Sequence, residues 1–251
     1  MTVQSHDQVS DRLLKAARAL PVQRVSKLCV DGRNYYVKMA ETHANWRWRL
    51  QKGDPLKAFE REKSLLTAFL ARGAAVPKVL TQDEKRIVLA DHGRPLHRFL
   101  IEGEAAQQGL HSAGQTLAEL HRKGLAHGRP SLRDLCWDGA RVTFLDLEAG
   151  AKLDANTHDK ARDLLLLLHS ALVFETDTQR AAEVILQAYR SQGEAQVWQK
   201  ARELARKLGW LEALAAPVIW WHVIRDKKRS EFRALRKLRN LVLHESASLS
   251  K

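Results

Sequence analysis

Hydrophobic residues change their spacing along the chain, and the change divides it into a β-rich part and a mostly helical part. Between residues 22 and 40, the runs KLCV and NYYVKMA are rich in β-branched and aromatic residues and are separated by Asp31-Gly32-Arg33. Aspartate followed by glycine between two such runs is a strong hairpin signal. The runs VPKVL and RIVLA predict two further short strands.

A helix is predicted between these pairs of strands, from Pro55 to about Arg72. Asp54 is a good capping residue, proline suits the first helical position, and Gly73 suits the end. The apolar face of this helix repeats at helical spacing and consists of Phe59, Leu66 and Phe69. Ahead of the strands, residues 1–20 are predicted to form a polar arm followed by a short amphipathic helix.

The rest of the chain is predicted to be helical apart from one small hairpin. A helix ends near Gly124 and is followed by the compact loop HGRPSLRD. The runs LCW and VTFL flank Asp138-Gly139 and predict a second hairpin that leads into Asp146. Residues from about Thr157 to Leu243 have helical periodicity. We therefore predict an α+β fold of two lobes, and ligands favour the crevice between lobes.

The predicted domain boundaries follow these changes of pattern. They define an N-terminal arm and helix (1–20), a small β-rich lobe (21–93), a mostly helical lobe (94–216) and a basic amphipathic C-terminal helix (217–251).

The composition is that of an ordinary globular protein, with 251 residues of which 45% are hydrophobic and 28% charged. This excludes global disorder and collagen-like repeats. Cys29 and Cys136 are too few for a disulfide framework, which fits a reducing compartment. The N-terminus lacks the apolar stretch of a secretory signal, and the longest apolar segment, near Leu211–Ile224, is interrupted by Glu212 and His222. We therefore expect a cytoplasmic protein.

The charge balance is unusual, because 42 Lys and Arg against 29 Asp and Glu give a formal net charge of +13. Such an excess predicts an anionic partner: nucleic acid, a phosphorylated metabolite or an acidic membrane surface. The alternative is a basic surface that only keeps the protein soluble. Much of the excess lies in residues 217–243, where basic residues and tryptophans border an imperfect apolar stripe. That pattern suits a helix on an anionic membrane surface, and it equally suits a terminal helix packed on the helical lobe. Nucleic acid is disfavoured, because we find no recognised DNA- or RNA-binding motif.

Lys38 and Glu62 are the first candidates for chemistry. Lys38 lies in the strand NYYVKMA between apolar neighbours, so it either extends off an edge strand into water or points into a cleft. Glu62 shares the apolar stripe of the predicted helix, where a carboxylate is costly unless it is paired. Lys38 is the obvious partner. The alternative places Glu62 at the edge of the stripe, on the helix surface.

Asp146 ends the second hairpin, a common place for a metal ligand and equally for a turn-forming aspartate. His127 and Asp134 stand at the two ends of the loop that precedes this hairpin. Carboxylate oxygens are the ligands that Mg²⁺ prefers.

The order of these parts resembles the protein-kinase-like fold: a strand lysine, a helix glutamate, the helix AGQTLAELHRKG, a loop begun by histidine and a hairpin ended by aspartate. Within that fold, HANWRWRL, FEREKSLLTAFLARGAAVPKVL and LAELHRKGLAHGR are similar to the bacterial lipopolysaccharide core kinases, which phosphorylate Kdo or heptose sugars. RIO-type atypical kinases are more distantly similar. The resemblance covers roughly Val25 to Leu168. It implies an ATP- and Mg²⁺-dependent phosphotransferase that acts on a glycolipid sugar, peripherally at the inner face of the cytoplasmic membrane.

The resemblance also implies roles for the candidate residues at the phosphates. Lys38 would hold the α- and β-phosphates of ATP and would be positioned by Glu62. Asp146 would coordinate Mg²⁺, and Asp134 would take the place of the asparagine that binds a second metal ion.

Further roles implied by the resemblance concern the loop and adenine. His127 would brace the loop, and Asp163 would support it from a helix. The segment Ala90–Leu96, with Ala90 and His92, would be the hinge that holds adenine.

Arg129 is the main departure from the resemblance. Two residues after the loop histidine, kinases carry an aspartate that orients and deprotonates the acceptor hydroxyl, whereas a guanidinium stays protonated at neutral pH and cannot act as a base. The chain also lacks a glycine-rich loop, because Gly32 is the only glycine before Lys38. Two interpretations stay open. Either transfer proceeds by positioning and electrostatics, with Arg129 bound to the γ-phosphate or an anionic acceptor, or the chain is an inactive pseudokinase scaffold. A Ser/Thr protein kinase, with a protein acceptor, is the alternative within the same class.

Overall fold

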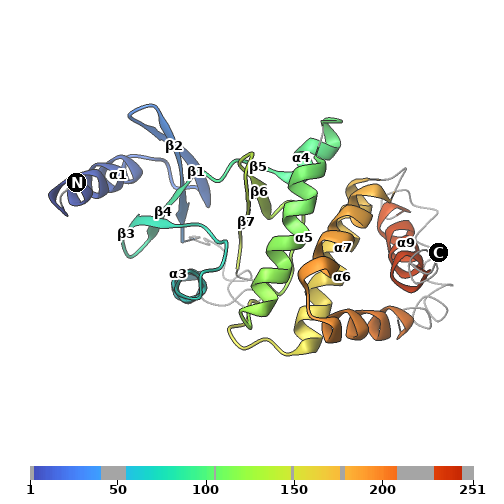
Figure 1. Cartoon of the computed structure of the whole chain (residues 1–251). Coiled ribbons are helices and arrows are strands. Elements are labelled where there is room, and N and C mark those ends of the chain that lie inside the picture. Colours follow the sequence, from blue (N-terminus) through green and yellow to red (C-terminus); the bar gives the residue numbers. More distant parts are fainter. Residues whose placement is uncertain are drawn as a thin grey trace. The chain divides into compact units, whose positions relative to one another are not determined.

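The computed structural model describes residues 3–40, 55–104, 106–147, 150–175, 179–207 and 229–244 (Figure 1). The chain divides into two compact units. Unit 1 comprises Met1–His92 with Asp146–Glu148, and unit 2 comprises Gly93–Leu145 with Ala149–Lys251. Unit 1 contains a four-stranded sheet and helices, and unit 2 is mostly helical with a three-stranded sheet, so the predicted α+β class is confirmed.

The sheet of unit 1 is antiparallel, with the strand order β1-β2-β4-β3. Its strands are β1 (Val25–Val30), β2 (Arg33–Met39), β3 (Val79–Gln82) and β4 (Arg86–Ala90). The predicted hairpin is present as β1 and β2, and its turn residues Asp31 and Gly32 have φ angles of 51° and 72°. A tight two-residue loop of this hand needs positive φ at both central positions, which explains the Asp-Gly pair.

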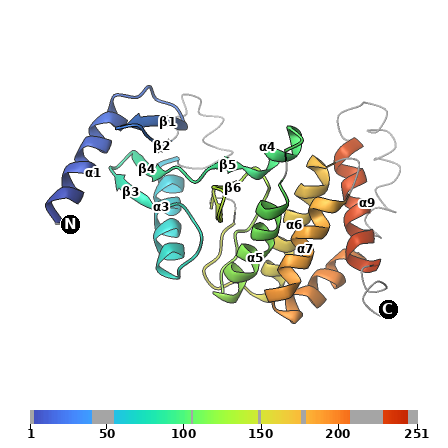
Figure 2. The same cartoon turned by 45° about the horizontal axis from the view of Figure 1, so that its top comes forward.

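Helix α1 (Val3–Arg18) packs on one face of this sheet, as Figures 1 and 2 show. Leu13 and Ala17 share a buried cluster with Val37 and Met39 of β2. The helix begins at Val3, so most of the predicted polar arm is itself helical.

Helix α3 (Pro55–Ala71) begins at the proline that the sequence marks as its first residue. It ends just before Gly73, whose φ of 69° places it in the left-handed region that glycine enters at little cost. The predicted apolar face is buried, and Glu62 is buried with it. The alternative of a surface position for Glu62 is therefore wrong.

The small sheet of unit 2 has the strand order β5-β6-β7. The predicted second hairpin forms β6 (Leu135–Trp137) and β7 (Val142–Phe144), with Gly139 at φ 97° in its turn. Strand β5 (Arg94–Pro95) pairs with β6 and was not predicted from DHGRPL. Two residues, one of them proline, carry no alternating pattern from which a strand could be recognised.

Within the described residues of unit 2, the helices are α4 (Leu96–Ile101), α5 (Gln107–Arg122), α6 (Thr157–Phe174), α7 (Arg180–Gln192), a helix over 195–207 and α9 (Arg229–His244). Helices α5 and α7 lie side by side in Figures 1 and 2. A Cβ at Gly114 of α5 would lie 2.3 Å from the Ile185 carbonyl oxygen, so only glycine permits this approach. Helix α6 begins with a reciprocal capping box between Asn156 and Asp159.

Helix α9 packs its apolar face on α6. Its buried residues are Ala234, Leu238, Leu241 and Val242. The described part of the C-terminal helix thus has the packing expected of a terminal helix on the helical lobe, while Arg236 is exposed. Trp220, Trp221 and Ile224, at the other end of the predicted helix, lie outside the described residues. None of the helices in the described ranges is long and apolar enough to cross a membrane.

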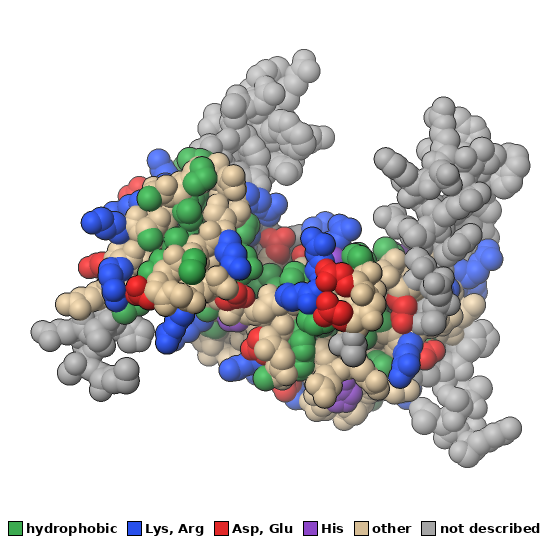
Figure 3. All heavy atoms as spheres, turned by 90° about the horizontal axis from the view of Figure 1, so that it is seen from above, with side chains coloured by type: hydrophobic (Ala, Val, Ile, Leu, Met, Phe, Trp, Pro, Cys, Tyr) green, Lys and Arg blue, Asp and Glu red, His purple; other side chains and the backbone are tan. Residues whose placement is uncertain are grey.

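Basic side chains recur over both units on the face shown in Figure 3, with acidic side chains between them. Some of these charges form local networks. On unit 2, Arg94 donates to Glu102 at 2.6 Å and to Glu104 at 3.0 Å. These exposed pairs contribute little to stability and leave the chain's net charge of +13 unchanged.

Candidate functional site

Lys38 is held on the inner strand β2, between β1 and β4, where it pairs with Val25 and Ile87. Successive side chains of a strand point to opposite faces. Because Val37 and Met39 pack with α1, Lys38 points to the other face. It is only 8% exposed, and its Nζ donates a hydrogen bond of 2.5 Å to Glu62 Oε1. The interpretation of Lys38 as a lysine extending off an edge strand is therefore wrong.

Glu62 reaches Lys38 from the buried face of α3, where it is 3% exposed. The spacing that places Phe59, Leu66 and Phe69 inside brings Glu62 inside with them. Burial of an unpaired carboxylate is costly, so the ion pair with Lys38 is what makes this position tolerable.

Asp146 completes the cluster, with its Oδ1 3.3 Å from Lys38 Nζ. Its backbone has a φ of 59°, in the left-handed region that few residues other than glycine adopt but that aspartate tolerates. Strain of this kind persists where the surrounding structure holds a residue in place, and it often marks a functional site. The side chain is 33% exposed, so this end of the cluster is open to solvent.

Arg24 is a fourth member of the cluster. Its Nη2 lies 3.7 Å from the same Asp146 Oδ1 that faces Lys38, and its side chain is 46% exposed. Two carboxylates near one ammonium repel each other, and the guanidinium of Arg24 balances the second negative charge. The cluster therefore pairs Lys38 and Arg24 with Glu62 and Asp146, buried at the glutamate and accessible at the aspartate.

The loop from His127 to Asp134 lies in unit 2, and hydrogen bonds to its backbone groups hold it in place. Asp163 of α6 accepts hydrogen bonds from the backbone N–H groups of His127 at 2.6 Å and Gly128 at 2.9 Å. His127 Nε2 donates to the carbonyl of Leu145 at 2.7 Å, and the Leu145 N–H donates to the carbonyl of Asp134 at 2.6 Å. The loop thereby fixes the residue that directly precedes Asp146 in the chain.

Gly128 is required at the start of this loop. Its φ is 93°, and a Cβ there would lie 2.4 Å from the backbone carbon of Gly150. Any larger residue would both strain the backbone and displace that segment.

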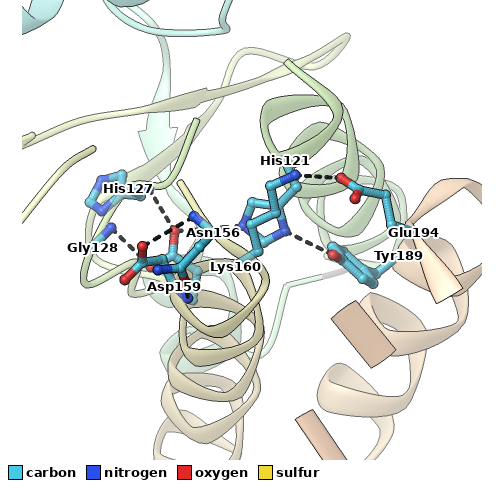
Figure 4. Close-up of polar contacts among 9 residues, drawn as sticks. His121, His127, Gly128, Asn156, Asp159, Lys160, Tyr189 and Glu194 are labelled. Carbon is cyan, nitrogen blue, oxygen red and sulfur yellow. Dashed lines mark hydrogen bonds and ion pairs between the residues drawn. The ribbon is translucent and has the colours of Figure 1, made fainter. Parts of the chain in front are cut away.

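A buried network lies behind Asp163. His121 of α5 has its Nε2 3.6 Å from Asp163 Oδ2, and its Nδ1 lies 2.8 Å from the hydroxyl of Tyr189. Figure 4 shows His121 pointing toward Tyr189. Nearby, Lys160 Nζ donates a hydrogen bond of 2.6 Å to Glu194 Oε1. Burial lowers the pKa of His121, against the opposing influence of Asp163, and burial raises the pKa of Tyr189. In the neutral imidazole, Nδ1 accepts a hydrogen bond from the hydroxyl of Tyr189, and the Nε2–H group lies on the side of the Asp163 carboxylate.

Four sequence candidates remain, and one of them, Asp134, contacts Leu145 through its backbone carbonyl. Arg129 is exposed and Asp134 is half-buried, both in unit 2. Ala90 ends β4, where it pairs with Tyr35, and His92 is half-buried at the end of the first segment of unit 1. Their roles toward adenine, acceptor or metal stay predictions.

Asp146 fits a metal that arrives with a nucleotide. Mg²⁺ in such sites is bound by one or two carboxylates together with substrate phosphates, so a dedicated protein cage is not needed. Across the described ranges, no group of three His, Cys, Asp or Glu side chains converges on one point. An accessible carboxylate oxygen beside two cations has the chemistry for a site shared between metal and phosphate.

Sequence reasoning found Lys38, Glu62 and Asp146 but missed Arg24. No motif marks this arginine, because only the folded sheet brings it to Asp146. His121 and Tyr189 were missed for the same reason. Their one signal is that each stands on the apolar face of its helix.

Comparison with known proteins gives the family context. The model of the lipopolysaccharide kinase (Kdo/WaaP) family matches residues 14–189, more than half of the chain and the part that contains the cluster. A protein of Haemophilus influenzae, described as uncharacterized, is similar at 28% identity over 199 residues, which cover 78% of this chain and 82% of that protein.

Proposed function

The chain belongs to the lipopolysaccharide kinase (Kdo/WaaP) family, and on that premise we propose that it transfers the γ-phosphoryl group of ATP to a hydroxyl group of a glycolipid sugar. The observation that supports this most strongly is the convergence of Lys38, Glu62 and Asp146 within unit 1. A buried lysine–glutamate pair beside an accessible aspartate is the arrangement that kinases use to hold ATP phosphates and metal.

Each residue then has one task. Lys38 binds the α- and β-phosphates, and Glu62 keeps its ammonium group in place. Asp146 holds Mg²⁺, and Asp134 is the proposed ligand of a second ion. When bound, Mg²⁺ neutralises the charge of the phosphates. Ala90 and His92 belong to the proposed hinge for adenine.

In the transfer, the acceptor hydroxyl oxygen forms a bond to the γ-phosphorus while the bond from that phosphorus to the bridging oxygen breaks, and ADP leaves. The hydroxyl proton departs to solvent or to a phosphate oxygen, because Arg129 cannot accept it. Such transfers proceed through a loose transition state and depend mainly on positioning and electrostatics, so a missing base slows the reaction without abolishing it. Exposed Arg129 is then placed to attract an anionic acceptor.

The acceptor class suggests where the protein works. Lipopolysaccharide core is anionic and lipid-anchored, and a chain with a net charge of +13 is attracted to an acidic membrane surface. Contact with the membrane through residues 217–243 is part of the proposal. Within the described part of α9, exposed Arg236 would contribute to this contact.

Arg129 supports a second candidate function, a nucleotide-binding scaffold without turnover. At the position where kinases place the proton-accepting aspartate, this chain presents an exposed cation. The cluster of unit 1 is compatible with nucleotide binding under either function.

A thermal-shift titration with ATP and Mg²⁺ tests binding. Excess ligand at 100 times its Kd stabilises the folded state by about 2.7 kcal/mol. Asp146→Asn, which keeps a residue that tolerates positive φ, and Lys38→Met should both reduce the shift. Lys85→Met, which removes an exposed lysine from the turn between β3 and β4, is the matched control and should retain it. Absence of any shift at millimolar nucleotide would refute ATP binding.

Turnover is measured with γ-labelled ATP and lipopolysaccharide core in anionic vesicles, with a generic protein acceptor in parallel. Label in the glycolipid supports the kinase, and label in the protein alone indicates a protein kinase. If wild type binds ATP without turnover and Arg129→Asp gains turnover, the protein is a scaffold inactivated at this position. Sedimentation of the same vesicles tests the membrane contact, which a double Arg236→Glu/Lys237→Glu variant should weaken.

A further inference from the structure

Arg24 occupies a fixed place at the accessible end of the cluster. It directly precedes β1, and its carbonyl oxygen accepts a hydrogen bond of 2.9 Å from the N–H of Met39, the last residue of β2. Val25, the next residue, is the register partner of Lys38. The sheet therefore fixes the backbone of Arg24 next to the end of β2, and the side chains of Arg24 and Lys38 both approach the same oxygen of Asp146, at 3.7 and 3.3 Å.

The ion pair between Arg24 and Asp146 is poorly explained as a stabilising contact. Both side chains are substantially exposed, 46% and 33%, and exposed ion pairs contribute little to folding. A long arginine held at an open site has another use. Its planar guanidinium presents several N–H donors in a geometry that matches phosphate oxygens, which the single point charge of a lysine does not.

We propose that Arg24 binds a phosphate group of ATP, in the place that a glycine-rich loop serves in other kinases. This inference rests on the proposed function. The chain has no glycine-rich sequence ahead of Lys38, so backbone N–H groups of such a loop cannot cover the phosphates. Arg24 supplies a side-chain cation from the start of β1 instead. Asp146 holds the guanidinium near the site until the aspartate binds metal, and the guanidinium then pairs with phosphate.

The proposal separates the two cations by location. Lys38 is buried and bound to Glu62, so it reaches phosphate from inside the cluster. Arg24 is half exposed and approaches from the solvent side. Two cations of different depth would hold a polyphosphate chain at two points, which a single lysine does not.

Calorimetric titration of the full chain with ATP in the presence of Mg²⁺ tests this directly. Arg24→Ala is expected to raise the Kd for ATP roughly tenfold or more, the loss typical of a charge-assisted contact. Arg24→Lys should recover only part of the affinity. Arg33→Ala is the matched control: it removes an exposed arginine from the far end of β2, with the same change in net charge, and should leave the Kd unchanged. Adenosine has no phosphate, so it should compete with ATP for the site equally well in wild type and in Arg24→Ala.

The outcomes separate this inference from the proposed function. If wild type binds ATP and Lys38→Met or Asp146→Asn weakens it while Arg24→Ala does not, the role of Arg24 is refuted and the ATP site stands. If wild type binds no ATP, both fail. If Arg24→Ala weakened adenosine binding as much as ATP binding, the phosphate contact would also be overturned, because such a loss would indicate damage to the fold of the site. A thermal melt of each variant without nucleotide verifies that it is folded.

Discussion

Two groups of carboxylates carry the candidate machinery of this protein, and they are bonded in different ways. In unit 1, Glu62 and Asp146 are paired with side-chain cations. In unit 2, Asp163 is 1% exposed and accepts hydrogen bonds from two backbone N–H groups of the loop. A side-chain cation can exchange one anion for another, whereas a backbone N–H in a tight loop cannot leave its partner. The first group is therefore suited to ligand exchange and the second to holding a backbone conformation.

The two groups also differ in how far their side chains are exposed to solvent. Asp146 and Arg24 are open to solvent, while Asp163, His121 and Tyr189 are buried. The difference implies that the exposed residues Arg24 and Asp146 can be replaced with loss of binding and little loss of stability, whereas the buried residues of unit 2 cannot. The following experiments test that contrast from the largest expected effect to the smallest.

Asp163→Ala should have the largest effect, lowering the free energy of unfolding by about 3–4 kcal/mol. It leaves two buried backbone N–H groups without an acceptor, at a cost of about 1–3 kcal/mol each. Denaturant unfolding at pH 7 measures the change. Asp138→Ala is the matched control, because Asp138 also accepts two backbone N–H bonds, from Ala140 and Arg141, but in an exposed turn. Its loss should be about 1 kcal/mol or less. Equal losses for both would contradict the structural role given to Asp163.

Lys38→Met should destabilise the protein by about 3 kcal/mol, because it leaves the Glu62 carboxylate buried without its ammonium partner. Glu62→Leu should cost less, since Lys38 keeps Asp146. The double variant Lys38→Met/Glu62→Leu should unfold within about 1 kcal/mol of wild type, because buried ion pairs are replaceable by apolar residues of similar volume. It should nonetheless bind no ATP. A double variant as unstable as the sum of the two single variants would show that the two residues are not energetically coupled, which would contradict the ion pair.

The smallest effect is a dependence of stability on pH. Burial lowers the pKa of His121 below its ordinary value of 6.5, and burial also lowers that of His97. Below about pH 6.5 the unfolded chain therefore takes up protons that the folded chain does not, and folding stability is lost as the pH falls. Urea unfolding at pH 7.5 and 5.5 measures the slope.

His121→Gln should flatten this slope, since it removes one of the two groups. His158→Gln, which removes an exposed histidine from α6, is the control and should keep the wild-type slope. A slope that persists unchanged in His121→Gln would place its origin elsewhere.

Local signals accounted for most of the fold and for three of the four residues of the cluster. Asp31-Gly32 predicted the hairpin that presents Lys38, and the stripe on α3 predicted that Glu62 faces inward. Both depend on the geometry of a few consecutive residues, which a single sequence records. The two-residue strand β5 left no such record, and its pairing with β6 depends on a partner far along the chain.

The sequence by itself determined the α+β class, the elements that carry Lys38 and Glu62, the excess of positive charge and the resemblance to a kinase family that comparison confirmed. Only the tertiary structure decided that Arg24 meets Asp146, and that His121 and Tyr189 stand behind Asp163. The physical reason is range. Side-chain periodicity and turn geometry are properties of neighbouring residues, but an ion pair between distant residues exists only after strands and helices have brought them together.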